Sequence, residues 1–329
     1  MSSYPAEPRA QKRRREGDSD DETTTIERSR RHWFDDGNII LQVESTQFRV
    51  NKGVLAMHSS GFRDMFTVPL PLDEPLVEGC PVVSLPGDSS EEWTYLLDAI
   101  YPKECFQPPP TIPQVSAILR LSNKYDIPAF RKEMVRRLRA HFPSSFADYN
   151  DSWEHIQKPS PAVSREYFAL LVGCVREVGL DVVLPCLYCV MIPTFFDMNG
   201  NLIHSPTRNL DLVDENRLLK ASLKFARLQE KSPHIRWCLP TRNIVPCDAC
   251  PRKDLCRSLA KNLLPELAIW LTPLSVLQPW RNMWSAGLCE SCVKVARAAY
   301  VDAQKGIWAE LPSFFSLPDW EELRSRDYD

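Results

Sequence analysis

Apolar and polar residues alternate with a period of two between residues 38 and 50, which predicts two short strands. Residues 44–47 are polar or small enough to form the turn between them. This period fits a first strand that is partly buried, and it places Phe48 and Val50 on one face of the second strand. The residues that alternate in this way are Ile39, Leu41, Val43, Phe48 and Val50.

After residue 50 the apolar period changes to three or four, which predicts helices. Asn51 leads into a short helix, and Ser59 or Ser60 can cap the next one. A third strand is expected at 82–85. Three amphipathic helices are then expected at 91–101, 115–125 and 128–142, the last of which starts at a proline. Strands and helices in this order fit one α+β domain.

The same stretch resembles the BTB/POZ family in its residues as well as in its pattern. The family motif F-x-V-H-K-x-x-L-x-x-x-S-x-x-F-x-x-x-F is matched by Phe48, Val50, Lys52, Leu55, Ser59, Phe62 and Phe66, and Asp36 supplies the family's acidic residue before the first strand. Asn51 departs from the motif, because it replaces the usual histidine. Residues 119–138 are similar to the family's later helix pair. The resemblance covers 32–145.

This resemblance implies a non-enzymatic protein–protein interaction module. The family commonly forms homodimers through its first helix and N-terminal segment, and some members recruit cullin-type ubiquitin ligases. This chain is therefore expected to self-associate or to act as a ligase substrate adaptor. No glycine-rich nucleotide motif or nucleophile signature points to an enzyme. The net charge of −3 gives no reason to expect nucleic acid or a membrane as partner.

The rest of the chain is expected to form a mainly α-helical domain at 164–329, after a linker at 146–163. Residues 167–175 and 182–190 are too apolar for a surface, and several of the nine tryptophans lie near the end of the chain, where they are expected to fill a core. Apolar residues at roughly helical spacing follow: Leu218, Leu219, Leu223 and Phe225. The whole layout resembles BTB proteins abundant in mushroom-forming (basidiomycete) fungi, a resemblance that supplies an architecture and no biochemical activity.

Paired cysteines at 247–292 carry the remaining chemistry. Cys247 and Cys250 form one C-x2-C pair, and Cys289 and Cys292 form another. Zinc prefers four thiolate or imidazole ligands, so two such pairs predict a structural zinc site if the chain folds back. Alternative ligands are Cys256, Cys238 and His234. Two other interpretations stay open: ordinary buried cysteines, or an exposed reactive thiol.

A third C-x2-C pair, Cys186 and Cys189, lies inside an apolar run, where packing in a helical core explains it better than redox chemistry. The chain has 11 cysteines and its basic, polar start shows no secretory signal, which favours reduced thiols in the cytoplasm or nucleus.

Residues 1–31 are expected to be a disordered, charged tail. The tail contains a candidate nuclear localisation signal at Lys12, Arg13, Arg14 and Arg15. The alternative function is therefore a nuclear transcriptional regulator with a zinc-stabilised C-terminal module. The charge around the cysteines argues against nucleic-acid binding, because acidic residues partly offset the basic ones.

Overall fold

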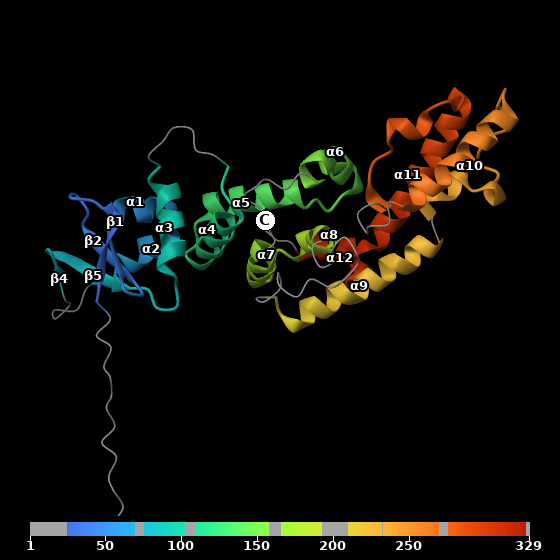
Figure 1. Cartoon of the computed structure of the whole chain (residues 1–329). Helices are drawn as coiled ribbons and strands as arrows, with labels where there is room; N and C mark the ends of the chain where they lie inside the picture. Colours follow the sequence, from blue (N-terminus) through green and yellow to red (C-terminus); the bar gives the residue numbers. More distant parts are fainter. Residues whose placement is uncertain are drawn as a thin grey trace, which may run out of the picture.

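The computed structural model describes residues 25–69, 76–102, 109–157, 166–192, 210–231, 233–269 and 276–326. The N-terminal part is a small sheet covered by helices (Figure 1). Its elements are β1 (Glu27–Trp33), β2 (Ile39–Val43), β3 (Thr46–Val50), α1 (Lys52–His58), α2 (Ser60–Met65), β4 (Leu76–Val77), β5 (Cys80–Ser84), α3 (Ser90–Ile100), α4 (Ile112–Lys124) and α5 (Pro128–His141).

The strands lie in the order β1-β3-β2-β5-β4. The hairpin of β2 and β3 has the expected register, with Leu41 opposite Phe48 and Ile39 opposite Val50. Strand β2 is more buried than the partly buried strand that the sequence predicts, because Ile40 is as fully buried as its neighbours. The reason is the position of the strand, because β2 lies between β3 and β5 in the middle of the sheet.

Of the two serines expected to cap the second helix, Ser59 is the one that does so. The Ser59 side chain accepts a hydrogen bond from the backbone N–H of Phe62 at 2.9 Å, which caps α2. Thr111 and Gln114 form a reciprocal capping box at the start of α4. The Phe62 ring stacks on Tyr125, with 5.0 Å between ring centroids, and so ties α2 to the end of α4.

Two segments differ from the sequence expectations. β1 begins at Glu27, inside the stretch 1–31 expected to be disordered, and pairs in parallel with β3. Its side chains are mostly charged and exposed, because an edge strand is held by backbone pairing and needs no apolar period. Residues 1–24, including the candidate localisation signal, lie outside the described residues. The expected linker at 146–163 contains a helix, α6, which buries Tyr149.

The C-terminal part is helical, as predicted, and extends the molecule away from the sheet (Figure 1). Helix α11 runs from the far end back toward α7 and α8. The elements are α6 (Phe146–Gln157), α7 (Glu166–Glu177), η1 (Asp181–Val183), α8 (Leu184–Met191), α9 (Leu212–Lys231), η3 (Pro233–Cys238), η4 (Pro240–Arg242), α10 (Lys253–Ile269), η6 (Asn282–Ser285), α11 (Glu290–Phe314) and α12 (Trp320–Ser325). In the part of the chain that the structure describes, no helix has the length and apolar content needed to span a bilayer.

Two apolar cores hold these helices. The larger core runs without interruption from the sheet through α7 and α8 to α12. In the part of this core formed by the end of the chain, the Trp308 ring stacks on Trp320 and contacts Tyr149, with 5.3 Å and 4.7 Å between ring centroids. The smaller core lies between η3, α10 and the first half of α11, and it contains five buried cysteines, Cys238, Cys250, Cys256, Cys289 and Cys292, with Cys247 packed against it. The described tryptophans of the last third are mostly buried, so they fill these cores as predicted.

Candidate functional site: a cysteine cluster and an interaction domain

Four buried cysteines of the smaller core and the half-buried Cys247 form a cluster, brought together by three short segments. Cys247 and Cys250 lie in the loop before α10, and Cys256 lies in the first turn of α10. Cys289 is the N-cap of α11, and Cys292 lies in the first turn of that helix. The cluster therefore joins the N-terminal ends of two helices to the loop that precedes one of them.

The sulfur atoms of Cys250, Cys256, Cys289 and Cys292 all lie within 4.8 Å of one another. The Sγ atoms of Cys289 and Cys250 are 3.6 Å apart. With zinc–sulfur bonds of about 2.3 Å, the edge of a tetrahedron of four thiolates is about 3.8 Å long. The spacing of these four sulfurs therefore suits a tetrahedral metal ion.

Cys247 lies at the edge of this group. Its Sγ is 3.7 Å from that of Cys292, yet its sulfur is not among the four that are mutually within 4.8 Å. The side chain of Cys247 is half-buried, whereas the other four cysteines are buried. The structure thus brings together all five cysteines singled out in the sequence, with Cys256 among the inner four and Cys247 beside them.

Backbone N–H groups around the cluster favour thiolates. The N–H of Cys247 points to the Sγ of Cys292, and the N–H of Cys289 points to the Sγ of Cys256, each at 3.4 Å. Hydrogen bonding from the backbone of Cys292 lowers the pKa of the Cys289 thiol to about 7. Burial raises the pKa of the Cys256 and Cys292 thiols. A divalent cation would stabilise all four as thiolates, because its charge offsets the cost of burying them.

Aromatic side chains pack close to the cluster in the same core. Trp280 contacts Trp237 at 4.9 Å, Trp284 at 5.5 Å and Tyr300 at 5.5 Å between ring centroids. The Tyr300 hydroxyl donates to the backbone carbonyl of Gln278 at 2.8 Å. These rings belong to the same apolar core as the cysteines, so their fluorescence can report whether that core is intact.

The other cysteine candidates lie apart from the group of four. Cys238 is buried in the same core, where its thiol donates to the carbonyl of Ile235 at 3.0 Å and burial raises its pKa to about 12. The side chain of His234 lies outside the described residues. Cys186 and Cys189 are fully buried in α8, and burial raises the pKa of both thiols, that of Cys189 to about 12. Packing therefore explains this pair, because a redox thiol needs an accessible thiolate.

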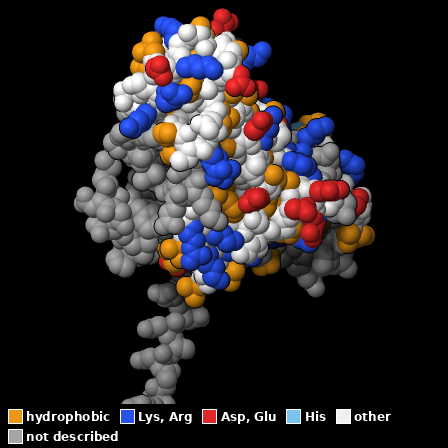
Figure 2. Space-filling model, turned by 90° about the vertical axis from the view of Figure 1, so that its right-hand side faces the viewer, with side chains coloured by type: hydrophobic (Ala, Val, Ile, Leu, Met, Phe, Trp, Pro, Cys, Tyr) orange, Lys and Arg blue, Asp and Glu red, His pale blue; other side chains and the backbone are white. Residues whose placement is uncertain are grey.

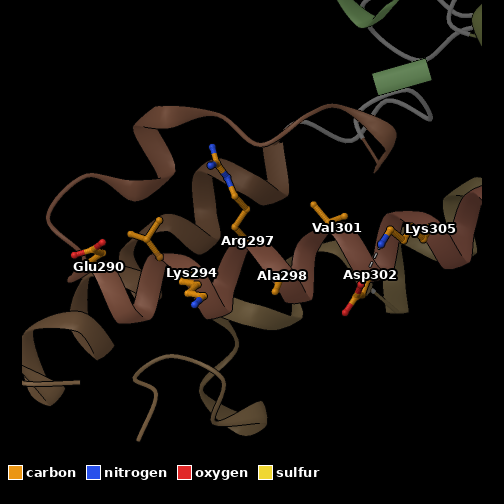
Figure 3. Close-up of a pocket in the computed structure, with 8 residues that line it drawn as sticks. Glu290, Lys294, Arg297, Ala298, Val301, Asp302 and Lys305 are labelled. Carbon is orange, nitrogen blue, oxygen red and sulfur yellow. Dashed lines mark ion pairs between the residues drawn. The ribbon is translucent and has the colours of Figure 1, made fainter. Parts of the chain in front are cut away.

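A shallow groove runs along the outer face of α11, from Glu290 to Lys305 (Figure 3). It encloses about 590 Å³ and is lined by charged and small apolar side chains. Lys305 pairs with Asp302 at 3.8 Å, and Lys294 and Arg297 lie along the same face. The lining of the groove contains no serine, cysteine or histidine.

The residues that match the family motif lie together in the N-terminal part. Phe48, Val50, Leu55 and Phe62 are buried in the larger core. Asn51, which replaces the motif's histidine, donates from its side-chain amide to the carboxylate and the backbone carbonyl of Asp36, at 3.2 Å each. Asn51, which departs from the motif, and Asp36, the acidic residue before the first strand, are therefore direct hydrogen-bond partners.

A comparison with protein-family models matches residues 27–141 to the BTB/POZ domain. Residues 27–141 form a BTB/POZ domain. The prediction of this domain is confirmed, and the match begins with β1, five residues before the expected boundary at residue 32. No curated protein matches the chain. The BTB/POZ domain is a protein-interaction module, so the part of its surface that is free of intramolecular contacts becomes the second candidate site.

Two large apolar side chains are exposed on the first segments of the BTB/POZ domain. Met57 of α1 is 68% exposed, and Ile26, just before β1, is 54% exposed. Leu55, two residues from Met57, is buried, so α1 presents one apolar side chain inward and another to solvent. Large apolar side chains that stay exposed in the single chain are candidates for burial by a partner.

Proposed function

We propose that this protein is a non-enzymatic assembly protein whose BTB/POZ domain self-associates and recruits a protein partner, while the helical region supplies a second interaction surface. The observation that carries the proposal is the BTB/POZ fold of residues 27–141 with Met57 and Ile26 exposed on its first helix and N-terminal segment. These are the segments through which, by resemblance, the family commonly dimerises.

Sedimentation analysis of the full chain tests self-association. Met57→Glu places a charge on the exposed face of α1 and is expected to convert a dimer into a monomer, because the charge would have to be desolvated in the interface. Met283→Glu is the matched control, since Met283 is a similarly exposed methionine (57%) on η6. A wild-type chain that sediments as a monomer, or equal effects of both variants, would contradict the proposal.

Partner recruitment is tested by affinity purification of the full chain from cells, followed by mass spectrometry. We propose a cullin-type ubiquitin ligase scaffold as the partner, on the basis of the family resemblance. Recovery of a cullin with the wild type and its loss in variants of the BTB/POZ surface would support a substrate-adaptor role. Recovery of the chain itself and nothing else would leave a self-associating scaffold and remove the ligase role.

A protein partner also suits the charge on the helical end of the molecule. Figure 2 shows that face, on which Lys and Arg side chains are interspersed with Asp and Glu side chains. Nucleic acid is held mainly by concentrated positive charge that neutralises phosphates. A face of mixed sign favours protein partners, whose surfaces carry both signs as well.

We propose in addition that the cysteine cluster holds one structural zinc ion. Four thiolates fill the coordination sphere of zinc, which leaves no open position for a reacting water. Metal analysis of protein purified without chelator is expected to give one zinc per chain. Replacement by cobalt is expected to produce the absorption bands of tetrahedral thiolate coordination. Absence of bound zinc and of those bands after reduction of the thiols would remove the metal and leave five packed cysteines.

A further inference from the structure

Helix α9 carries two apolar stripes on different faces. The inner stripe, Leu218, Ala221 and Phe225, is fully buried, and the Phe225 ring meets that of Phe314 at 4.9 Å. The outer stripe consists of Leu212, Leu219 and Leu223, which are 78%, 37% and 65% exposed. A surface helix needs only one apolar stripe to pack on its own domain. Figure 1 shows α9 along the outer edge of the helical region, and none of the three outer leucines belongs to the described core.

The outer stripe has the spacing of a coiled-coil seam. Leu212, Asn216, Leu219 and Leu223 follow one another at intervals of four, three and four residues, as d, a, d and a positions of a heptad do. Asn216 is exposed and takes one a position. A single asparagine at an a position favours a parallel, two-stranded arrangement in register, since its side chain finds a partner only in the equivalent asparagine.

The charges beside the seam indicate which direction a second helix takes. Glu215 flanks one side of the seam at a g position, and Lys220 flanks the other side at an e position. In a parallel pair Glu215 of one chain faces Lys220 of the other, five residues further along. In an antiparallel pair the e positions of one helix face the e positions of the other. Lys220 and Arg227, which both take e positions, would then face like charges.

We propose that α9 pairs with α9 of a second copy of this chain, as a short parallel coiled coil along Leu212–Leu223. The inference rests on the proposed self-association in one respect, because a seam of fewer than two heptads is too short to hold two free chains together. Once the BTB/POZ domains join two chains, the second contact is intramolecular and acts at an effective concentration of about millimolar. The seam then fixes the two helical regions side by side.

Cysteine cross-linking of the full chain tests this pairing. Leu212→Cys and Leu219→Cys each place a thiol at a d position, which faces its own copy across a parallel seam. Mild oxidation is expected to give covalent dimers with both variants. The controls are the wild type, which carries all native cysteines, and Leu255→Cys, a leucine of comparable exposure (46%) on α10. In an antiparallel pair, only a residue near the centre of the seam faces its own copy in the other chain. Cross-linking by Leu219→Cys without cross-linking by Leu212→Cys therefore overturns the parallel seam.

A sedimentation measurement separates failure of the seam from failure of the proposed function. Leu223→Glu is expected to raise the dimer dissociation constant of the full chain by at least about tenfold, because two leucines lose their apolar contact, whereas Leu255→Glu leaves it unchanged. A wild-type dimer without cross-links above the Leu255→Cys level overturns the seam and leaves BTB/POZ self-association in place. A wild-type monomer without cross-links removes both.

Discussion

Cys256 and Cys247 differ in how they would contribute to a zinc site, and serine substitutions measure that difference. Cys256 is fully buried, and its sulfur lies within 4.8 Å of three other sulfurs. Cys247 is half-buried and contributes a backbone N–H to the sulfur of Cys292 at 3.4 Å. Cys256→Ser removes a sulfur from the inner four. Cys247→Ser keeps the backbone donor and removes only the outer sulfur.

The size of the two effects follows from these contacts. Removing a group that only orients a metal ligand costs about 10-fold to 100-fold in affinity. Loss of a ligand itself is larger, so Cys256→Ser is expected to weaken zinc binding by more than about 100-fold, which is more than about 2.8 kcal/mol at about 1.4 kcal/mol for each factor of ten. Because Cys247→Ser retains the backbone hydrogen bond, it is expected to cost less than about 10-fold.

Competition against a chromophoric zinc chelator measures both affinities under reducing conditions. Tryptophan emission from the core around Trp280 reports whether each variant remains folded before the metal is removed. An equal or larger loss with Cys247→Ser would refute the assignment of Cys256 and would favour the two C-x2-C pairs as the ligand set. Unchanged affinity in both variants would mean that neither thiol holds the ion.

Three further substitutions test the folded structure. Asp88→Ala should lower the free energy of unfolding by about 3 kcal/mol in urea titrations, because it leaves the buried Trp93 indole N–H without the acceptor it now reaches at 2.9 Å. Phe225→Ala should cost about 3 to 5 kcal/mol by the same assay, since this fully buried ring fills the space under α9. Glu133→Gln tests a pH effect: hydrogen bonding from Arg136 lowers the pKa of Glu133 to about 2, so its stabilising contribution is present above about pH 4.5 and is lost as the pH falls toward 2. The Glu133–Arg136 ion pair is largely exposed, so the free energy of unfolding of Glu133→Gln, obtained from thermal melts at pH 7, should differ from that of the wild type by less than about 1 kcal/mol. At pH 2 this difference should shrink. An equal difference at both pH values would contradict the lowered pKa of Glu133.

The sequence predicts the BTB/POZ domain well because its signals are local. Alternation at 39–50 fixes the hairpin register, and Ser59 caps its helix with a side chain three residues from the bonded N–H. A motif made of such local contacts can be recognised from the sequence alone. The same reasoning explains why β1 is missed: its pairing with β3 is a backbone contact over a distance in sequence, and its charged side chains carry no period.

The spacing of the cysteines predicts which of them form C-x2-C pairs, but it does not determine which four sulfurs would bind a metal ion. Two sulfurs of a C-x2-C pair are neighbours by chain geometry, but the place of Cys256 depends on the direction in which α10 leaves the loop. That direction is set by packing of α10 against η3 and α11 in the smaller core. A sequence gives no direct signal for such packing, so the alternative ligand in the sequence becomes one of the inner four in the structure.

The sequence of helix α9 likewise does not show which of its apolar residues are buried within the chain. Leu218, Leu219, Leu223 and Phe225 look like one amphipathic pattern in the sequence, yet the structure divides them between two faces. Leu218 and Phe225 are used in folding this chain, whereas Leu219 and Leu223 are left exposed. A helix that only had to fold could carry polar residues at those two positions without loss of packing. The leucines on the outer face therefore point to a requirement outside the single chain, and the heptad spacing through Asn216 identifies a second copy of α9 as the surface that meets it.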